Sequence, residues 1–429
     1  MEPKRDPERA PPALLAALGE QQRLWKSMLS VPRVVATALH TRVGTSEHDV
    51  VLRERTHALL HYRRATPATH AEPVLLCYAL VNRPYILDLQ PDKSVVQQYL
   101  RRGFEVYMID WGVPSDADRA LTLEDYVCGY LARAVEFVRR EHDSARVHLV
   151  GYCMGGTMAA VHGALQPDTM ATLTLLAAPI DFGPNASLLN LWTQHPYFDV
   201  DSLIAAYGNC PAWFLQGCFL AMDPVRNFFD KAVAFYDQMT DPRSVESHFA
   251  LEHWLNDNIP VAGATFREFV HKLYQHNELV RGQLCLGARR VELGQITCPV
   301  LLLTAKNDHL VAPESTEGIR PHVGSREVTS MAIRAGHVGL VVGTRAHAGF
   351  WLEATGWMAE RSNPATIATS AKVATPLEVA TPLARPLAVP MSDPGARPVP
   401  APSHEAPPSP GQMTFRRAAP EPRWWALNR

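Results

Sequence analysis

The chain has 429 residues, of which 47% are hydrophobic and 20% are charged, enough for one large hydrophobic core with appended segments. Its formal net charge is −2, which argues against binding to nucleic acid or to an anionic membrane surface. No run approaches the roughly 20 apolar residues that a transmembrane helix needs, and the charged N-terminus lacks the pattern of a secretory signal.

The seven cysteines are odd in number, and none forms a C-x-x-C pair or lies near a histidine at zinc-binding spacing. An odd count in a chain of this length is typical of free thiols in a reducing compartment. The sequence therefore predicts no disulfide framework, no metal site and no cofactor, and it favours a cytoplasmic location.

The first part of the chain is predicted to form a helical segment and the start of a sheet. Residues 1–45 are predicted to be an N-terminal helical segment, and residues 46–64 to form two short strands around a turn. Residues 73–81 form a continuous apolar run, which is typical of a strand buried on both faces.

Strands and helices then alternate. The sequence predicts a helix at 91–102, a strand at 104–110, a helix at 123–141, a strand at 147–151, a helix at 155–165 and a strand at 172–178. This alternation favours a mainly parallel sheet with helices on both faces. We assign residues 46–181 to the first part of this core.

The pattern changes in the middle of the chain. Residues 182–285 are rich in aromatic residues and have helical periodicity without a clear strand, so we predict a helical cap inserted over the carboxyl edge of the sheet. Strands resume at 299–304 and 327–333, and residues 346–360 suit a closing helix. Residues 286–360 are therefore predicted to complete the core.

Composition shifts again after residue 360. Residues 364–422 hold 14 of the 35 prolines of the chain. Such a segment buries too little apolar surface to offset the entropy lost on ordering. Residues 361–429 are therefore predicted to be a disordered tail.

The most informative motif joins the predicted strand at 147–151 to the helix that follows it. It reads Gly151-Tyr152-Cys153-Met154-Gly155-Gly156. Gly-x-Cys-x-Gly-Gly in this setting is the nucleophile elbow of an α/β-hydrolase, with cysteine where serine usually stands. A thiolate is a strong nucleophile and a good leaving group, so the motif favours acyl transfer between thioesters over simple ester hydrolysis.

A nucleophilic cysteine needs a base, and the base needs an acid that orients it. In this fold the chain order is nucleophile, acid, base, with the acid and the base each following a strand. Asp308 follows the strand at 299–304, and His337 follows the strand at 327–333. His309 is a competing base, but consecutive residues leaving a strand point in different directions. We therefore predict a triad of Cys153, Asp308 and His337.

An oxyanion hole is expected beside the nucleophile. The backbone N–H of Met154, the residue after the cysteine, is the first predicted donor. The second is an N–H from the loop after the strand at 73–81, with Val81 or Asn82 as the natural donor. Asn82 is equally well explained as an ordinary turn residue.

Together with its flanking segments, the elbow resembles that of a known family, the polyhydroxyalkanoate synthases. The resemblance covers roughly residues 48 to 358, and the short N-terminal region is similar to the catalytic subunit of the two-subunit, class III kind. The matching segments are the Gly-x-Cys-x-Gly-Gly elbow, Tyr78 to Pro91, Val106 to Pro114, Ala117 to Tyr126, Phe266 to Asn277, Asp308 to Pro313 and Gly336 to Gly339.

The resemblance implies a polymerising acyltransferase that uses (R)-3-hydroxyacyl-coenzyme A thioesters as substrates. Cys153 would carry the growing polyester, His337 would activate the thiol, and Asp308 would support chain elongation with release of coenzyme A. The resemblance also implies a second synthase subunit, a homodimer or hetero-oligomer, and association with polymer granules in the cytoplasm. Trp111 matches an Asp-Trp-Gly element of the family, although a buried core tryptophan explains it equally well.

Two other functions share these residues. A cysteine hydrolase, such as a thioesterase or a polyester depolymerase, would have the same fold and triad, and access of water to the acyl-enzyme would distinguish it. A non-catalytic granule or scaffold protein would not need all three triad groups in order.

Within the elbow, Met154 and Tyr152 differ from the typical two-subunit pattern, which has Gln after the cysteine.

Overall fold

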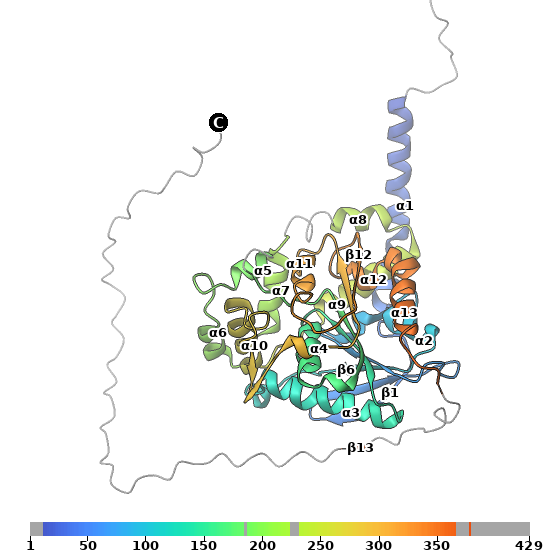
Figure 1. Cartoon of the computed structure of the whole chain (residues 1–429). Helices are drawn as coiled ribbons and strands as arrows, with labels where there is room; N and C mark the ends of the chain where they lie inside the picture. Colours follow the sequence, from blue (N-terminus) through green and yellow to red (C-terminus); the bar gives the residue numbers. More distant parts are fainter. Residues whose placement is uncertain (1–11, 184–186, 224–230, 366–376, 379–429) are drawn as a thin grey trace, which may run out of the picture. The chain divides into compact units, whose positions relative to one another are not determined.

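A computed structural model describes residues 12–183, 187–223, 231–365 and 377–378 of the chain (Figure 1). Its main sheet has nine strands in the order β12-β11-β8-β7-β3-β6-β2-β1-β13. Their bounds are β1 (His48–Glu54), β2 (His57–Tyr62), β3 (Val74–Cys77), β6 (Val106–Asp110), β7 (Val147–Tyr152), β8 (Met170–Leu176), β11 (Val300–Ala305), β12 (Val328–Ile333) and β13 (Leu377–Glu378).

The centre of the sheet is parallel from β12 through β6, and only the pairs β6–β2 and β2–β1 are antiparallel. Every residue of β7 and β11 is buried, as expected of parallel strands covered on both faces. The predicted mainly parallel α/β-hydrolase sheet is thereby confirmed.

Helices pack against the sheet in two groups. In one, α2 (Val95–Arg102) contacts α13 (Trp351–Ala359), which follows the π-helical turn η8 (Ala346–Phe350). In the other, α4 (Met154–Leu165) contacts β7, β8 and the π-helical turn η3 (Asp125–Leu131), which leads into α3 (Ala132–Glu141). The helices predicted at 123–141, 155–165 and 346–360 agree with these bounds to within two residues, whereas the helix predicted at 91–102 begins only at Val95, after the short strand β5 (Lys93–Ser94). The long N-terminal helix α1 (Pro12–His40) contacts α9.

Between β8 and the short hairpin of β9 (Cys285–Leu286) and β10 (Arg289–Arg290), every regular element of the described chain is a helix, as predicted for the cap, and loops join the helices (Figure 1). Its helices are α5 (Leu188–Trp192), α6 (Val200–Tyr207), α7 (Ala212–Ala221), α8 (Lys231–Gln238), α9 (Pro242–Asn256), α10 (Gly263–Glu268) and the π-helical η6 (Phe269–Gln275). Asp199 and Asp241 are the N-cap residues of α6 and α9, and their side chains accept hydrogen bonds from the backbone N–H groups of Ser202 and Ser244. The function of this segment as a cap stays a prediction.

The structure differs from the sequence prediction at β3. The strand was expected to span residues 73–81, but it ends at Cys77. Residues 78–80 continue as a loop whose side chains are nonetheless at most 4% exposed. An apolar run therefore continued past the end of the strand because the loop itself is buried.

The start of the predicted tail also differs. Residues 361–365 are bound to the core: Asn363 donates to the carboxylate of Glu72 from both its backbone and its side chain, and Ser362 is hydrogen-bonded to His148. The pair Leu377–Glu378 forms β13 beside β1. The rest of the predicted disordered tail, residues 366–376 and 379–429, lies outside the described residues. Among the described helices, none has both the length and the apolar character to cross a membrane.

Because of three buried histidines, we expect the free energy of unfolding to fall in acid. Burial lowers the pKa of His57 to about 4, of His148 to about 3 and of His162 to about 4. At these three positions the unfolded chain binds more protons than the folded chain below about pH 6.5, so their contribution to the free energy of unfolding falls as the pH falls. Each histidine contributes a loss of about 1.4 kcal/mol per pH unit until its folded pKa is reached.

Urea unfolding measured at pH 7 and at pH 5 tests this expectation. The unfolding midpoint should fall at the lower pH, and the fall should be smaller in His148→Gln because one depressed group is gone. His322→Gln is the matched control, since His322 is exposed. The same pH dependence in His148→Gln and in the unmodified chain would contradict the argument.

Candidate active site

The nucleophile elbow lies between β7 and α4. Cys153 has φ of 54° and ψ of −130°, a conformation that costs a residue with a Cβ atom strain energy and occurs mainly at functional sites. The flanking glycines permit it: a Cβ atom on Gly155 would lie 2.2 Å from the carbonyl oxygen of Cys77, and one on Gly151 would lie 2.4 Å from Cα of Gly156. The structure thus agrees with the predicted strand–turn–helix bend at the cysteine.

Asp308 follows β11, and its two carboxylate oxygens have separate partners. Oδ1 accepts hydrogen bonds from the backbone N–H groups of Leu310 and Val311, both at 2.9 Å. Oδ2 faces Nδ1 of His337 at 2.7 Å. The side chain of Asp308 is fully buried and that of His337 is 12% exposed, so the pair is held away from bulk water.

His337 lies in the loop after β12 and links the acid to the nucleophile. Burial lowers the pKa of His337, but the carboxylate of Asp308, the sulfur of Cys153 and hydrogen bonds to both raise it more, to about 10. With Nδ1 engaged by Asp308, Nε2 is the ring nitrogen left for the sulfur. The three predicted residues are therefore brought together. His309 is exposed while its neighbour Asp308 is buried, so the two point in different directions.

Tyr152, the residue before the nucleophile, packs on the histidine. Its ring is stacked on the ring of His337 with centroids 5.0 Å apart, and its hydroxyl donates to the carbonyl of His337 at 3.3 Å. Sequence reasoning noted Tyr152 only as an unusual elbow residue and missed this contact. Burial raises the pKa of Tyr152, and so does the charge of the neighbouring Cys153.

Two further tyrosines lie close enough to the nucleophile for its charge to raise their pKa values. Burial raises the pKa values of Tyr78 and Tyr274, and the charge of Cys153 raises both further. Tyr78 follows β3, whereas Tyr274 belongs to η6 in the predicted cap. The helical segment after β8 therefore contributes a side chain to the surroundings of Cys153.

The loop after β3 is fixed by two tryptophans. Trp111 is 3% exposed and donates from Nε1 to the carbonyl of Tyr78 at 2.8 Å. Trp254 of α9 donates in the same way to the carbonyl of Arg83 at 2.8 Å. Trp111 is thus a core residue that also holds the loop beside the elbow.

The predicted oxyanion hole draws on this loop and on α4. Met154 is the first residue of α4, and the first N–H groups of a helix have no partner within the helix. Asn82 has φ of 62°, and its buried Oδ1 has no hydrogen-bond partner among the described residues. The assignment of Met154 and Val81 as donors stays a prediction.

Replacing Tyr152 by phenylalanine or by alanine separates ring packing from the hydroxyl group. Tyr152→Phe keeps the stacked ring and loses only a long hydrogen bond, so kcat should stay within about threefold, the equivalent of less than 1 kcal/mol. Tyr152→Ala frees the imidazole, and misplacement of a catalytic group costs about 100-fold. Steady-state rates, with thermal unfolding as a check on the fold, measure both. Equal losses in the two variants would contradict a role of the ring in holding His337.

Comparison with known proteins identifies relatives and the fold family of the chain. A model of the α/β-hydrolase fold matches residues 72–343, and a model of the poly-beta-hydroxybutyrate polymerase N-terminus matches residues 26–100. The chain is 39% identical to the poly(3-hydroxyalkanoate) polymerase subunit PhaC of Haloferax mediterranei, over 82% of this chain and 73% of that protein.

Two relatives from other organisms carry the same name. The protein of Allochromatium vinosum is 38% identical over 74% of this chain and 90% of the relative. That of a Synechocystis species is 34% identical over 75% of this chain and 86% of the relative. The matched region includes the strands that carry the predicted triad.

Proposed function

The chain belongs to the poly(3-hydroxyalkanoate) polymerase family, and from this premise we propose that it elongates polyester on Cys153 and releases coenzyme A. It is a polyhydroxyalkanoate synthase, an acyltransferase-type polymerase that resembles the class III catalytic subunit. What is proposed is the covalent step and the part that each residue plays in it.

In the first half-reaction the thiol proton of Cys153 passes to Nε2 of His337. The sulfur attacks the thioester carbonyl of a hydroxyacyl-coenzyme A, the carbon–sulfur bond to coenzyme A breaks, and the departing thiol takes the proton back from His337. Asp308 holds the ring by accepting from Nδ1–H at 2.7 Å and stabilises the imidazolium. The N–H groups of Met154 and Val81 are the proposed donors to the oxyanion.

In the second half-reaction a hydroxyl group replaces the thiol. The 3-hydroxyl of a hydroxyacyl thioester gives its proton to His337, its oxygen attacks the acyl carbon on Cys153, and the sulfur leaves and recovers the proton. One ester bond forms for each thioester bond consumed. We propose (R)-3-hydroxyacyl-coenzyme A as the substrate class, with no cofactor.

One observation carries this proposal: a cysteine stands at the elbow, His337 faces Asp308 at 2.7 Å, and the sulfur of Cys153 is near enough to raise the pKa of His337. The low exposure of the His337 and Asp308 side chains favours transfer to a bound hydroxyl over transfer to water. The relatives are named as polymerase subunits. We therefore also propose a second synthase subunit, assembly into a homodimer or hetero-oligomer, and a location on polymer granules in the cytoplasm.

The test supplies 3-hydroxybutyryl-coenzyme A to the purified full chain and follows free thiol together with product mass. We expect coenzyme A release with oligomeric or polymeric ester, and a lag that a second subunit shortens. Release of coenzyme A with only monomeric 3-hydroxybutyrate would favour a thioesterase and exclude the polymerising step. Incubation with preformed polyester tests the depolymerase alternative, because of these activities only a depolymerase would release hydroxy acid from the polymer.

A further inference from the structure

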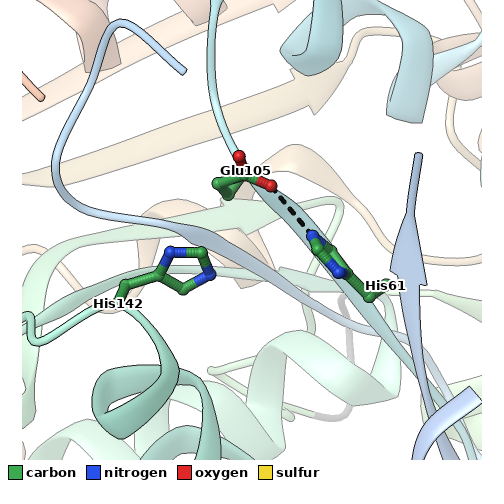
Figure 2. Close-up of side chains that lie close together, drawn as sticks. All are labelled: His61, Glu105 and His142. Carbon is green, nitrogen blue, oxygen red and sulfur yellow. Dashed lines mark hydrogen bonds and ion pairs between the residues drawn. The ribbon is translucent and has the colours of Figure 1, made fainter. Parts of the chain in front are cut away.

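Three side chains that can bind a metal ion converge far from the elbow. They are His61, Glu105 and His142, and one ligand atom of each lies within 4.8 Å of the others. Figure 2 shows both imidazole rings pointing toward the space below the carboxylate. All three residues are partly buried, so the cluster is shielded without being closed to an entering ion.

Each of the three residues lies in a strand or next to the end of a strand or helix. His61 lies on β2, opposite Tyr107 in the antiparallel register with β6. Glu105 immediately precedes β6, and His142 immediately follows α3. The Tyr107 ring contacts both imidazoles: it is stacked on His61 with centroids 4.3 Å apart and edge-on to His142 at 5.6 Å. The ligands are therefore preorganised by the sheet and by an aromatic ring.

The carboxylate is oriented by a second residue. Oε2 of Glu105 faces Nε2 of His61 at 2.8 Å, while Oε1 accepts from Nη1 of Arg64 at 3.3 Å. The Arg64 side chain is only 7% exposed and also donates to the carbonyl of Gly103. Partners of this kind hold the ligands of protein metal sites in position. Tyr107 hydrogen-bonds Nε2 of His142 at 2.8 Å, so its hydroxyl must turn aside for an ion to take that nitrogen.

We propose that His61, Glu105 and His142 bind a divalent transition-metal ion, with Zn²⁺ the best fit. Two imidazoles and a carboxylate are a ligand set that zinc prefers, with water in the fourth position. Ligands at about 2.0–2.1 Å from a tetrahedral ion lie roughly 3.3 Å apart. The ligand atoms that are farthest apart, at most 4.8 Å, would close by up to roughly 1.5 Å, and Nε2 of His61 and Oε2 of Glu105, now 2.8 Å apart, would separate by roughly 0.5 Å. The sequence prediction of no metal rested on cysteine spacing and did not consider these residues.

This site is separate from the chemistry at Cys153. Glu105 precedes β6 at the amino end of the parallel strands, whereas Cys153 follows the carboxyl end of β7. At about 3.3 Å per residue, strands of this length separate the two ends by roughly 15–20 Å. The ion would link the end of α3 to β2 and to the residue before β6. Because a ligand that binds only the folded state stabilises that state, we expect the ion to raise the stability of the fold.

The experiment titrates metal-free protein with Co²⁺, read by visible absorption, and then with Zn²⁺ by displacement. The Cys153→Ala background is used, because a thiolate next to His337 is itself a metal ligand. We expect saturation at one ion per chain and a higher melting temperature with Zn²⁺. Glu105→Gln and His142→Gln should each weaken binding by about tenfold or more, whereas the exposed control His322→Gln should not.

A measurement on the chain without substitutions at the cluster keeps the test independent of variants that fold poorly. X-ray absorption of the zinc-loaded protein should give nitrogen and oxygen neighbours at about 2.0 Å, with imidazole scattering and no sulfur. Absence of saturable binding, a sulfur shell, or equal affinity in Glu105→Gln, His142→Gln and His322→Gln would each overturn the proposal.

Discussion

Cys153→Ala should abolish both the release of coenzyme A and the formation of polyester, with a loss of about 10⁴-fold or more. The size follows from enzymes with a covalent nucleophile, where loss of a triad member removes the reaction path and not only a contact. Alanine keeps the Cβ atom, so the strain of the positive φ at this position is unchanged. The fold of the elbow should therefore survive the substitution.

Free-thiol release and product mass from 3-hydroxybutyryl-coenzyme A measure the effect. Cys285→Ala is the matched control, because Cys285 is an exposed free cysteine on the short strand β9 (Cys285–Leu286). Intact mass under single turnover should show a hydroxyacyl adduct on the unmodified chain and on Cys285→Ala, and none on Cys153→Ala. Activity of Cys153→Ala within tenfold of the control would show that another group carries the acyl chain.

The triad could be predicted because its members follow strand ends that are visible in the sequence. The runs at 147–151 and 299–304 are short and mostly apolar and end at Gly151 and Thr304, whereas the run at 327–333 mixes polar and apolar residues and is followed by Arg334. Parallel strands bring their carboxyl ends to one edge, so the chain order alone places the groups near each other. The structure adds the hydrogen bond between His337 and Asp308 and places the sulfur of Cys153 near enough to raise the pKa of His337.

What the sequence could not predict depends on contacts between distant residues. The stacking of Tyr152 on His337 joins positions 185 residues apart, and neither position has a spacing that indicates it. The cluster of His61, Glu105 and His142 is assembled by the β2–β6 register and the end of α3. Short motifs detect ligands that share one element, and these three do not.

Two boundaries were predicted wrongly, because each depends on contacts that the local composition does not show. The strand predicted to reach Val81 ends at Cys77, because a buried loop is as apolar as a buried strand. The predicted tail began at residue 361, yet Arg361 pairs with Glu327 and Asn363 binds Glu72. Composition measures how much apolar surface a segment carries, and it contains no information about polar partners elsewhere in the chain.

Asp308→Asn should lower kcat by about 10⁴-fold while leaving the fold intact. The carboxylate uses one oxygen for the N–H groups of Leu310 and Val311 and the other for Nδ1–H of His337. An asparagine side chain has only one oxygen. If that oxygen keeps the two backbone donors, the amide NH₂ faces Nδ1 and favours the tautomer protonated at Nε2, which cannot take the thiol proton.

The pH dependence distinguishes this explanation from a simple loss of structure. After burial, which lowers the pKa of His337, the charge of Asp308 is the largest influence and raises it, so the pKa of His337 should fall in Asp308→Asn and the pH–rate profile should shift with it. Asp241→Asn makes the same change at the exposed residue that begins α9 and should leave the profile unchanged. A loss of about 10⁴-fold without any shift in the profile would mean that Asp308 acts on the loop that carries it and not through the imidazole.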